Sequence, residues 1–367
     1  MLRRPLFGIP WPGQLPDLRD LLRGKPVAPD DPAEFRDAAI AHRLTGFADA
    51  AIRTGRLRLP DPFARQLQDA HAVAAVRSAM LRRELLRIAP PLAEGCGAEP
   101  LVIKGPAVAE ALYEPRTLRP FADLDLLVPR SKLEAAVDTL ARLGYRANLH
   151  LRPGFAERYR HDIHFSRRQG DRTLGIDLHW RISDDPLGTE LAHDRIEVAP
   201  LEIDGARMAS PGPADRLLVL STHFLTDRLR RLLWIEDVRR AALAADESQW
   251  LETFERADEK GLSWVLHRAL DYAAHHLGLA RERPRPPEPP PAWGPLRAIE
   301  RFQFAAAWDL GHLTSIPWRE RPGYLRATLL PSREGLRGAA ADPEGPTWRL
   351  ALGRMRRAFR SARTGSR

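Results

Sequence analysis

The chain has 367 residues, of which 44% are apolar and 29% are charged, a composition that is ordinary for a globular protein with a sizeable core. No stretch approaches the roughly 20 uninterrupted apolar residues of a membrane helix, and the first residues do not form the apolar segment of a secretory signal. We therefore expect a cytoplasmic protein with no membrane span. A single cysteine, Cys96, excludes an internal disulfide and a cysteine-based zinc site.

The net charge of +9 is concentrated at the C-terminal end of the chain. Seven arginines and no acidic residue lie within 345–367, so the rest of the chain carries a net charge of only +2. This distribution excludes a globally basic nucleic-acid-binding protein. We expect the tail to be a solvated end, and contact with an acidic partner, with RNA or with a membrane surface stays open.

Residues 1–98 are predicted to form an N-terminal helical region. Apolar residues at helical spacing predict one helix over 32–54 and a longer one over 61–94. Pro90-Pro91 is expected to interrupt the longer helix, because proline removes a backbone N–H donor.

Residues 99–210 have the pattern of a core in which strands alternate with helices. Short apolar runs bounded by glycine and proline predict the strands, which are 101–104, 123–128, 145–150, 161–168, 173–180 and a pair split by Pro200, 195–199 and 201–208. Helices are predicted over 106–113 and from a capping box of Ser131 and Glu134 to Gly144. The predicted fold class is α+β: an α/β core with a mixed sheet, flanked by helical N- and C-terminal regions.

The remainder of the chain is predicted to be helical around one linker. Residues 211–280 read as a helical C-terminal domain, with helices at 213–226, 230–245, 248–260 and 263–279. Residues 281–295 form a proline-rich linker. Residues 296–367 are expected to be a helical extension with the basic tail, with helical pieces near 296–310 and 347–361.

Two carboxylates in one short strand are the centre of the functional prediction. Side chains alternate between the faces of a strand, so Asp123 and Asp125 share one face while Leu124 and Leu126 point into the core. Like charges held this close repel each other, and a divalent cation removes that cost. Mg²⁺ prefers one or two carboxylates together with substrate phosphates. The pair therefore predicts a metal site.

A second strand, 173–180, supplies a third carboxylate. Asp177 and His179 share its polar face, and if this strand lies beside the first, Asp177 completes a site for two Mg²⁺ ions. On the strand between them, His164 is either a further contact to phosphate or acceptor, or a surface histidine. His179 is a candidate cofactor-binding residue, because it lies two residues after Asp177 on the same face of the strand.

A turn and an arginine suggest where phosphate binds. Lys104-Gly105-Pro106 joins a predicted strand to a predicted helix, where free backbone amides can face an anion. Lys104 is one of four lysines in a chain whose basic residues are almost all arginine. Arg119, in the loop before the two aspartates, is expected to pair with a phosphate oxygen.

Three aromatic side chains and one further aspartate complete the set of residues with predicted roles. His223 and Trp234 are each predicted to pack on a helix, and Trp180 is predicted to lie in the core. Asp237 is expected to bond either to the base of a nucleotide or to an arginine.

These motifs together resemble the uncharacterised nucleotidyltransferase family of bacteria, within the DNA polymerase β-like superfamily. The resemblance spans roughly residues 35–280 and rests on a Lys-Gly at a strand end, an arginine before Asp-hydrophobic-Asp, and a later Asp-x-His-Trp. In this chain the positions are Lys104-Gly105, Arg119, Asp123 with Asp125, and Asp177-Leu178-His179-Trp180.

The resemblance implies an Mg²⁺-dependent enzyme that moves a nucleoside monophosphate from an NTP, with ATP expected, to an acceptor hydroxyl. The acceptor stays open among a sugar, a peptide, a protein and RNA. The chain departs from the superfamily's usual Gly-Ser or Gly-Gly turn at Gly105-Pro106, and Pro106 has no N–H to offer phosphate. Two alternatives follow: a catalytically inactive nucleotide-binding regulatory protein, and an RNA-directed enzyme such as a tRNA-modifying toxin that uses the basic tail.

Overall fold

The computed structural model describes residues 15–147, 159–183, 191–226, 231–288 and 317–329. The basic tail, residues 289–295 of the proline-rich linker and the helices predicted near 296–310 and 347–361 lie outside these ranges. Within them, no helix is both long enough and apolar enough to cross a membrane.

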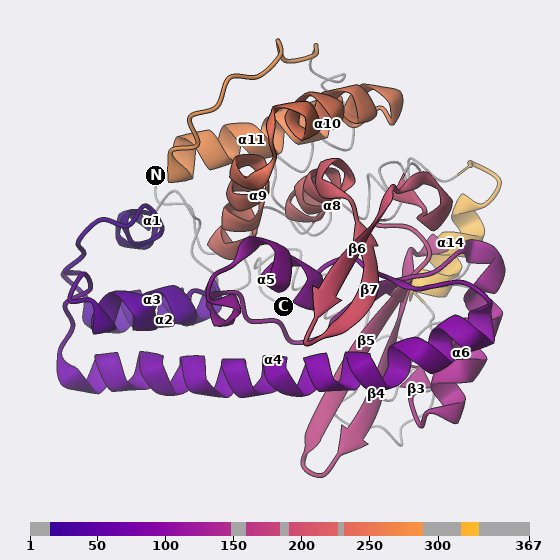
Figure 1. Ribbon diagram of the computed structural model, residues 1–367, viewed down its shortest axis with the longest axis horizontal. Coiled ribbons are helices and arrows are strands. Elements are labelled where there is room, and N and C mark those ends of the chain that lie inside the picture. Colours follow the sequence, from indigo (N-terminus) through magenta and orange to yellow (C-terminus); the bar gives the residue numbers. More distant parts are fainter. Residues whose placement is uncertain (1–14, 148–158, 184–190, 227–230, 289–316, 330–367) are drawn as a thin grey trace.

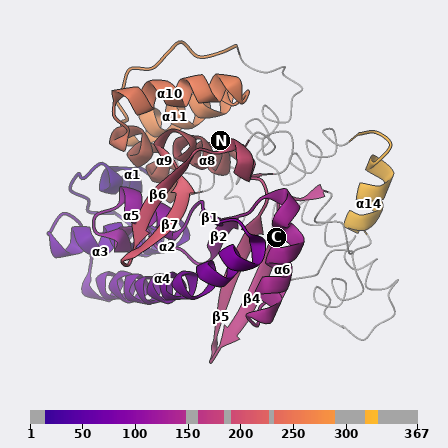
Figure 2. The same ribbon diagram turned by 45° about the vertical axis from the view of Figure 1, so that its right-hand side comes forward.

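The described residues contain a mixed seven-stranded sheet with the strand order β3-β4-β5-β2-β1-β7-β6. Strands β3 to β7 are labelled in Figure 1, and β1 and β2 in Figure 2. The pairs β2–β5 and β1–β7 are parallel and the other neighbours are antiparallel, which confirms the predicted α+β class. The strands are β1 (Leu101–Val102), β2 (Leu124–Leu127), β3 (Arg146–Ala147), β4 (Asp162–Gln169), β5 (Arg172–His179), β6 (Val198–Ile203) and β7 (Ala206–Pro211).

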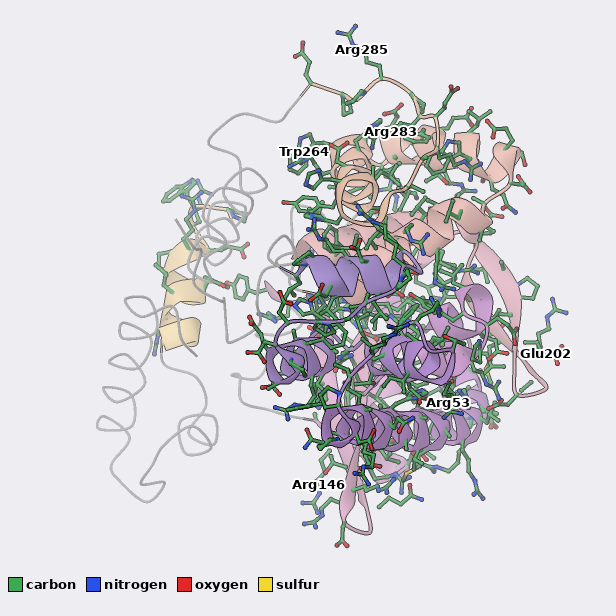
Figure 3. All side chains as sticks on the ribbon, turned by 90° about the vertical axis from the view of Figure 1, so that its left-hand side faces the viewer. Arg53, Arg146, Glu202, Trp264, Arg283 and Arg285 are labelled. Atoms are coloured by element: carbon green, nitrogen blue, oxygen red, sulfur yellow. The ribbon has the colours of Figure 1, made fainter. Side chains whose placement is uncertain are left out.

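Helices precede, interrupt and follow the strands in the chain. They are α1 (Pro16–Leu22), α2 (Pro32–Ala41), α3 (Thr45–Arg53), α4 (Asp61–Cys96), α5 (Pro106–Leu112), α6 (Leu133–Arg142), α8 (Pro213–Thr226), α9 (Leu232–Ala244), α10 (Glu247–Glu259), α11 (Ser263–Leu277) and α14 (Arg321–Leu329). Figures 1 and 2 show α8–α11 gathered at one end of the molecule and α4 passing along the other. Charged side chains such as Arg53, Arg146 and Glu202 project outward from this body (Figure 3).

Two hydrophobic clusters lie on the two sides of the sheet. Leu124 and Leu126 of β2, together with Ile176 and Leu178 of β5, pack against the second half of α4 and against α6. The other cluster joins α1–α3 to α5 and to α8–α11. Because side chains alternate along a strand, the polar residues between these leucines and isoleucines face the second cluster.

Prolines mark two differences from the sequence prediction. Helix α4 continues through Pro90-Pro91 to Cys96, where an interruption was expected. The fixed φ of proline is itself helical, and the buried Ile88 and Leu92 on either side keep the apolar face of α4 against α6, which offsets the lost hydrogen bonds. Pro200 lies inside β6 and does not end a strand, because β6 is at the edge of the sheet, where proline is tolerated.

Helix boundaries account for the other differences. The single helix expected over 32–54 is two helices, separated at Arg43, whose φ of 58° is left-handed. The capping box expected at Ser131 is absent, since a 3₁₀ turn over Arg130–Lys132 precedes α6 and Lys132 is its N-cap. Helices α1 and α14 were not predicted.

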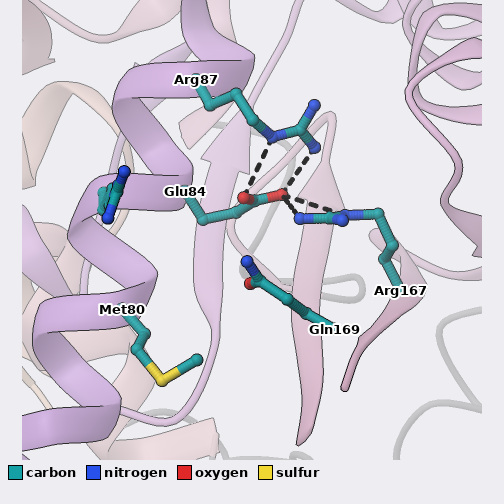
Figure 4. A pocket seen from close by; sticks show the side chains of 6 residues that line it. Met80, Glu84, Arg87, Arg167 and Gln169 are labelled. Carbon is teal, nitrogen blue, oxygen red and sulfur yellow. Dashed lines mark hydrogen bonds and ion pairs between the residues drawn. The ribbon is translucent and has the colours of Figure 1, made fainter.

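A buried carboxylate ties α4 to the sheet. Glu84 of α4 accepts hydrogen bonds from Arg87 and from Arg167 of β4 (Figure 4), and a third from the hydroxyl of Tyr145. Burial opposes ionisation of Glu84, but these donors lower its pKa from 4.5 to about 2. Glu84 therefore stays ionised in a site that is 5% exposed.

The apolar side of α4 generates a stability prediction. Leu85 is fully buried against α6, so Leu85→Ala is expected to lower the free energy of unfolding by about 2–5 kcal/mol, measured by urea denaturation. Val76→Ala on the same helix is the control, because Val76 is 49% exposed and its truncation leaves no cavity. Equal losses in the two variants would contradict the packing.

Glu84 generates a pH prediction. Its pKa is depressed in the folded state, so its stabilising contribution is present above about pH 4.5 and is lost as pH falls towards about 2. We expect Glu84→Gln to be less stable than the wild type at pH 7, with a gap that closes over this range. Urea unfolding at a series of pH values measures the gap, and a gap as large at pH 2 as at pH 7 would refute the ionic role.

Candidate functional site

Three polar side chains form a row across neighbouring strands. Asp125 of β2 is in register with Asp177 of β5, and Asp177 is in register with His164 of β4. In-register neighbours point to the same side of a sheet, and here that side is opposite the leucines and isoleucines that pack against α4 and α6. His164 Nδ1 lies 2.5 Å from Asp177 Oδ1. The structure therefore places the two predicted acidic strands side by side, with His164 at the end of the row next to Asp177, although its strand lies between the two acidic strands in the sequence.

Asp125 is the most enclosed member of the row, and it is 6% exposed. Lys104 Nζ lies 2.7 Å from its Oδ1, and Nε2 of His179 lies 3.2 Å from the same oxygen. Burial opposes ionisation of Asp125, but Lys104 and His179 hold its pKa well below the usual range. Burial likewise favours neutral Lys104, yet Asp125 raises the pKa of that lysine above its ordinary value.

Asp123 lies one residue before β2 and is half-buried. Burial raises the pKa of its carboxyl, and the charges of Asp125 and Asp177 raise it further. Arg43 and Lys104 act in the opposite direction. The negative charges of Asp125 and Asp177 therefore disfavour ionisation of Asp123, and a cation placed among the three carboxylates would remove that cost.

The donor set fits a cation. One ligand atom from each of Asp125, Asp177 and His179 lies within 4.8 Å of the other two, and Asp123 is outside this group among the described residues. Carboxylate oxygens suit Mg²⁺, whereas an imidazole nitrogen suits transition metals better. Since Nε2 of His179 already contacts Asp125, and its buried Nδ1 has no partner among the described atoms, we interpret His179 as orienting Asp125.

The turn between β1 and α5 lies close to the backbone of Asp123, directly before β2. Gly105 has φ 51° and ψ −115°, a conformation that only glycine adopts readily. A Cβ at this position would lie 3.4 Å from the backbone oxygen of Asp123. Pro106 follows as the first residue of α5, as predicted.

Arg119 lies apart from this row. Its guanidinium is buried and donates to Asp237 of α9, with Nη2 2.9 Å from Oδ2, and its Nη1 donates to the carbonyl oxygen of Gly105 at 3.3 Å. Tyr113 donates to the same carboxylate at 2.6 Å. The expectation that Asp237 bonds to an arginine is confirmed. Arg119 thereby links the Gly105 turn to α9, and the phosphate contact expected for it from the sequence stays a prediction.

The packing interpretation of His223 and Trp234 is confirmed. Their rings lie 4.9 Å apart at an interplanar angle of 68°, and Trp234 is buried. Trp180 is also buried, in the cluster with α4 and α6. Burial and the charge of Lys104 lower the pKa of His223 well below its ordinary value, so this ring borders the row as a neutral group.

Sequence reasoning missed Arg43. This residue acts electrostatically on Asp123 although it precedes that aspartate by 80 positions. It has left-handed backbone geometry directly after His42, whose buried ring accepts a hydrogen bond from the backbone N–H of Leu232. No local motif marks an arginine in a turn between two helices, so only the folded chain shows its place.

Comparison with known families identifies the family of the chain. A family model described as an uncharacterised nucleotidyltransferase matches residues 28–278, which is more than half of the chain. The matched range contains the whole row as well as the Arg119–Asp237 pair. No curated protein matches the chain.

The buried ion pair generates a prediction. Asp237→Asn leaves Arg119 charged and without its carboxylate partner, so we expect the free energy of unfolding to fall by about 3–5 kcal/mol. The matched control is Asp37→Asn, which breaks a pair with Arg36 in which Asp37 is 69% exposed and which is expected to cost about 0–1 kcal/mol. Thermal or urea unfolding measures both, and indistinguishable losses would contradict the role of the Arg119–Asp237 pair.

Proposed function

We propose, because the chain belongs to the uncharacterised nucleotidyltransferase family, that it transfers a nucleoside monophosphate from an NTP to the hydroxyl group of an acceptor in the presence of Mg²⁺. The observation that carries this proposal is the in-register placement of Asp125 and Asp177 on adjacent parallel strands, with Lys104 in contact with Asp125. Two carboxylates and an ammonium beside a glycine turn suit a triphosphate. ATP is the expected donor.

Asp125 and Asp177 would hold the metal, with Asp123 completing the second position. Bound Mg²⁺ supplies charge neutralisation for the triphosphate and lowers the pKa of an acceptor hydroxyl. Asp125 is fixed for this role by two neighbours, Lys104 and His179, so little reorganisation is needed when substrate arrives.

Asp177 and His164 have separate roles in the proposed reaction. Asp177 is more exposed than Asp125, so an acceptor hydroxyl reaches it and gives its proton to the carboxylate. The acceptor oxygen forms a bond to the α-phosphorus as the bond from that phosphorus to the bridging oxygen breaks, and pyrophosphate leaves. The hydrogen bond that His164 donates to Asp177 raises the pKa of His164, which favours the charged form of the ring, a form suited to a phosphate oxygen.

Two observations favour a second function, namely metal-dependent nucleotide binding without turnover. The Lys104 ammonium already neutralises Asp125 at 2.7 Å, so a metal ion has to compete with it. Pro106 also removes one backbone donor from the turn that would face phosphate. A regulatory nucleotide-binding protein needs the site but not the transfer step.

Activity is tested with each of the four NTPs labelled at the α-phosphate, in Mg²⁺ and in EDTA, with separate pools of RNA, protein and small hydroxyl compounds as acceptors. We expect label transfer and pyrophosphate release in Mg²⁺ only. Asp125→Asn is expected to reduce the rate more than about 100-fold, since even outer partners of a metal are worth about 10–100-fold. Asp171→Asn, in the exposed β4–β5 turn, is the matched control and keeps the rate.

Three outcomes separate the alternatives. A rate that is unchanged in Asp125→Asn would sink the assignment of the site. NTP binding that is detected by calorimetry and depends on Mg²⁺, without label transfer to any pool, would replace the enzyme by the nucleotide-binding protein. Transfer to the RNA pool alone would select RNA as the acceptor.

A further inference from the structure

A separate cavity of about 590 Å³ lies between α4 and the β4–β5 hairpin. It is lined by Met80, Arg83, Glu84, Arg87, Arg167 and Gln169, as Figure 4 shows from close by. Arg167 and Gln169 of β4 point to the same face of the sheet as Phe165, which packs in the cluster with α4 and α6. His164 points to the opposite face. The cavity therefore opens on the opposite face of the sheet from Asp125 and Asp177.

Glu84 holds two guanidinium groups of this cavity in fixed positions. Nε and Nη2 of Arg87 donate to its carboxylate at 3.0 and 2.7 Å, and Nε and Nη2 of Arg167 donate at 3.2 and 2.8 Å. Arg87 lies on α4 and Arg167 on β4, yet both contact the buried carboxylate of Glu84 (Figure 4). Because each guanidinium has five N–H donors, these bonds leave further donors on each arginine.

The lining carries an excess of positive charge. Arg83, Arg87 and Arg167 contribute +3 and Glu84 contributes −1, so the six residues carry +2. The side chain of Arg87 is 41% exposed, and Arg83 is also exposed. A fourth guanidinium, that of Arg172, stands beside the cavity, with its Nη1 2.8 Å from the sulfur of Met80. Fixed arginines around an open cavity are suited to an oxyanion.

We propose that this cavity binds a phosphomonoester through Arg83, Arg87 and Arg167. A phosphomonoester carries a charge of about −1.5 to −2 at pH 7, which matches the +2 of the lining. The volume is within the roughly 300–1,000 Å³ of small-molecule sites, so it holds an organic group as well as the phosphate. Met80 and Gln169 offer an apolar and an amide surface to that group. The site is independent of the proposed transfer reaction, because it lies on the other face of the sheet.

The test is calorimetric titration of the full chain, in EDTA, with phenyl phosphate and with inorganic phosphate. Phenyl phosphate is expected to bind the wild type, and the Arg83→Ala/Arg87→Ala variant is expected to bind it at least about tenfold more weakly, because charge-assisted hydrogen bonds are lost. The second ionisation of a phosphomonoester has a pKa of about 6, so binding is expected to be tighter at pH 8 than at pH 5.5.

The matched control removes the same charge from the other side of the sheet. Arg146 is in register with Ser166, and Arg168 lies two positions after Ser166, so both arginines are on the face of the sheet opposite the cavity. The Arg146→Ala/Arg168→Ala variant removes these two exposed arginines and is expected to keep the wild-type affinity for phenyl phosphate. Equal losses in both double variants, or no loss in Arg83→Ala/Arg87→Ala, would overturn the site. Binding of a short RNA through Arg83 and Arg87, with no binding of phenyl phosphate, would overturn it in favour of a nucleic-acid surface. Circular dichroism confirms that each variant is folded.

Discussion

A carboxylate in the middle of a sheet, beside a hydrophobic core, requires charge compensation from other parts of the chain. Asp125 imposes this requirement here, because it is 6% exposed and its strand is flanked on both sides. Lys104, from the end of β1, and His179, from β5, meet it at the same oxygen atom. Asp125 is therefore held in a fixed position, while Asp177, its in-register neighbour on β5, is more exposed to solvent. A buried pair of this kind orders the site more than it stabilises the fold.

The helices are bound to the site by the same kind of interaction. Arg119 contacts Asp237 of α9 and the carbonyl oxygen of Gly105, so the turn beside the carboxylates is held by a helix more than 100 residues further along the chain. His42 accepts a hydrogen bond from Leu232 at the start of α9 and thereby positions the Arg43 turn. The helices before and after the sheet share one hydrophobic cluster, which keeps these contacts in register. The site is therefore assembled by the whole matched region and not by the sheet alone.

The two faces of the sheet solve the problem of buried charge differently. On one face, three carboxylates, Asp123, Asp125 and Asp177, lie near Lys104, and this excess of acids is the basis of the proposed metal site. On the other, Glu84 is one acid among several arginines, and it arranges them around a cavity. Alternation along β4 separates the two, since His164 and Arg167 are an odd number of residues apart. Neighbouring residues in the sequence thus serve opposite electrostatic purposes.

The sequence by itself determined the fold class, most strands and helices, and the residues of the carboxylate row, because apolar periodicity and side-chain alternation are local properties. The sequence could not determine which partners the charged side chains meet in the folded chain. Arg119 and Asp237 meet only after α9 packs against α5, and Arg43 reaches Asp123 only through a turn between two helices. Pro90-Pro91 and Pro200 were misread for the same reason: whether a proline ends an element depends on the packing around it and on its place at the edge of the sheet. Local patterns fix which residues are polar neighbours on a strand, and tertiary packing fixes which opposite charge each of them meets.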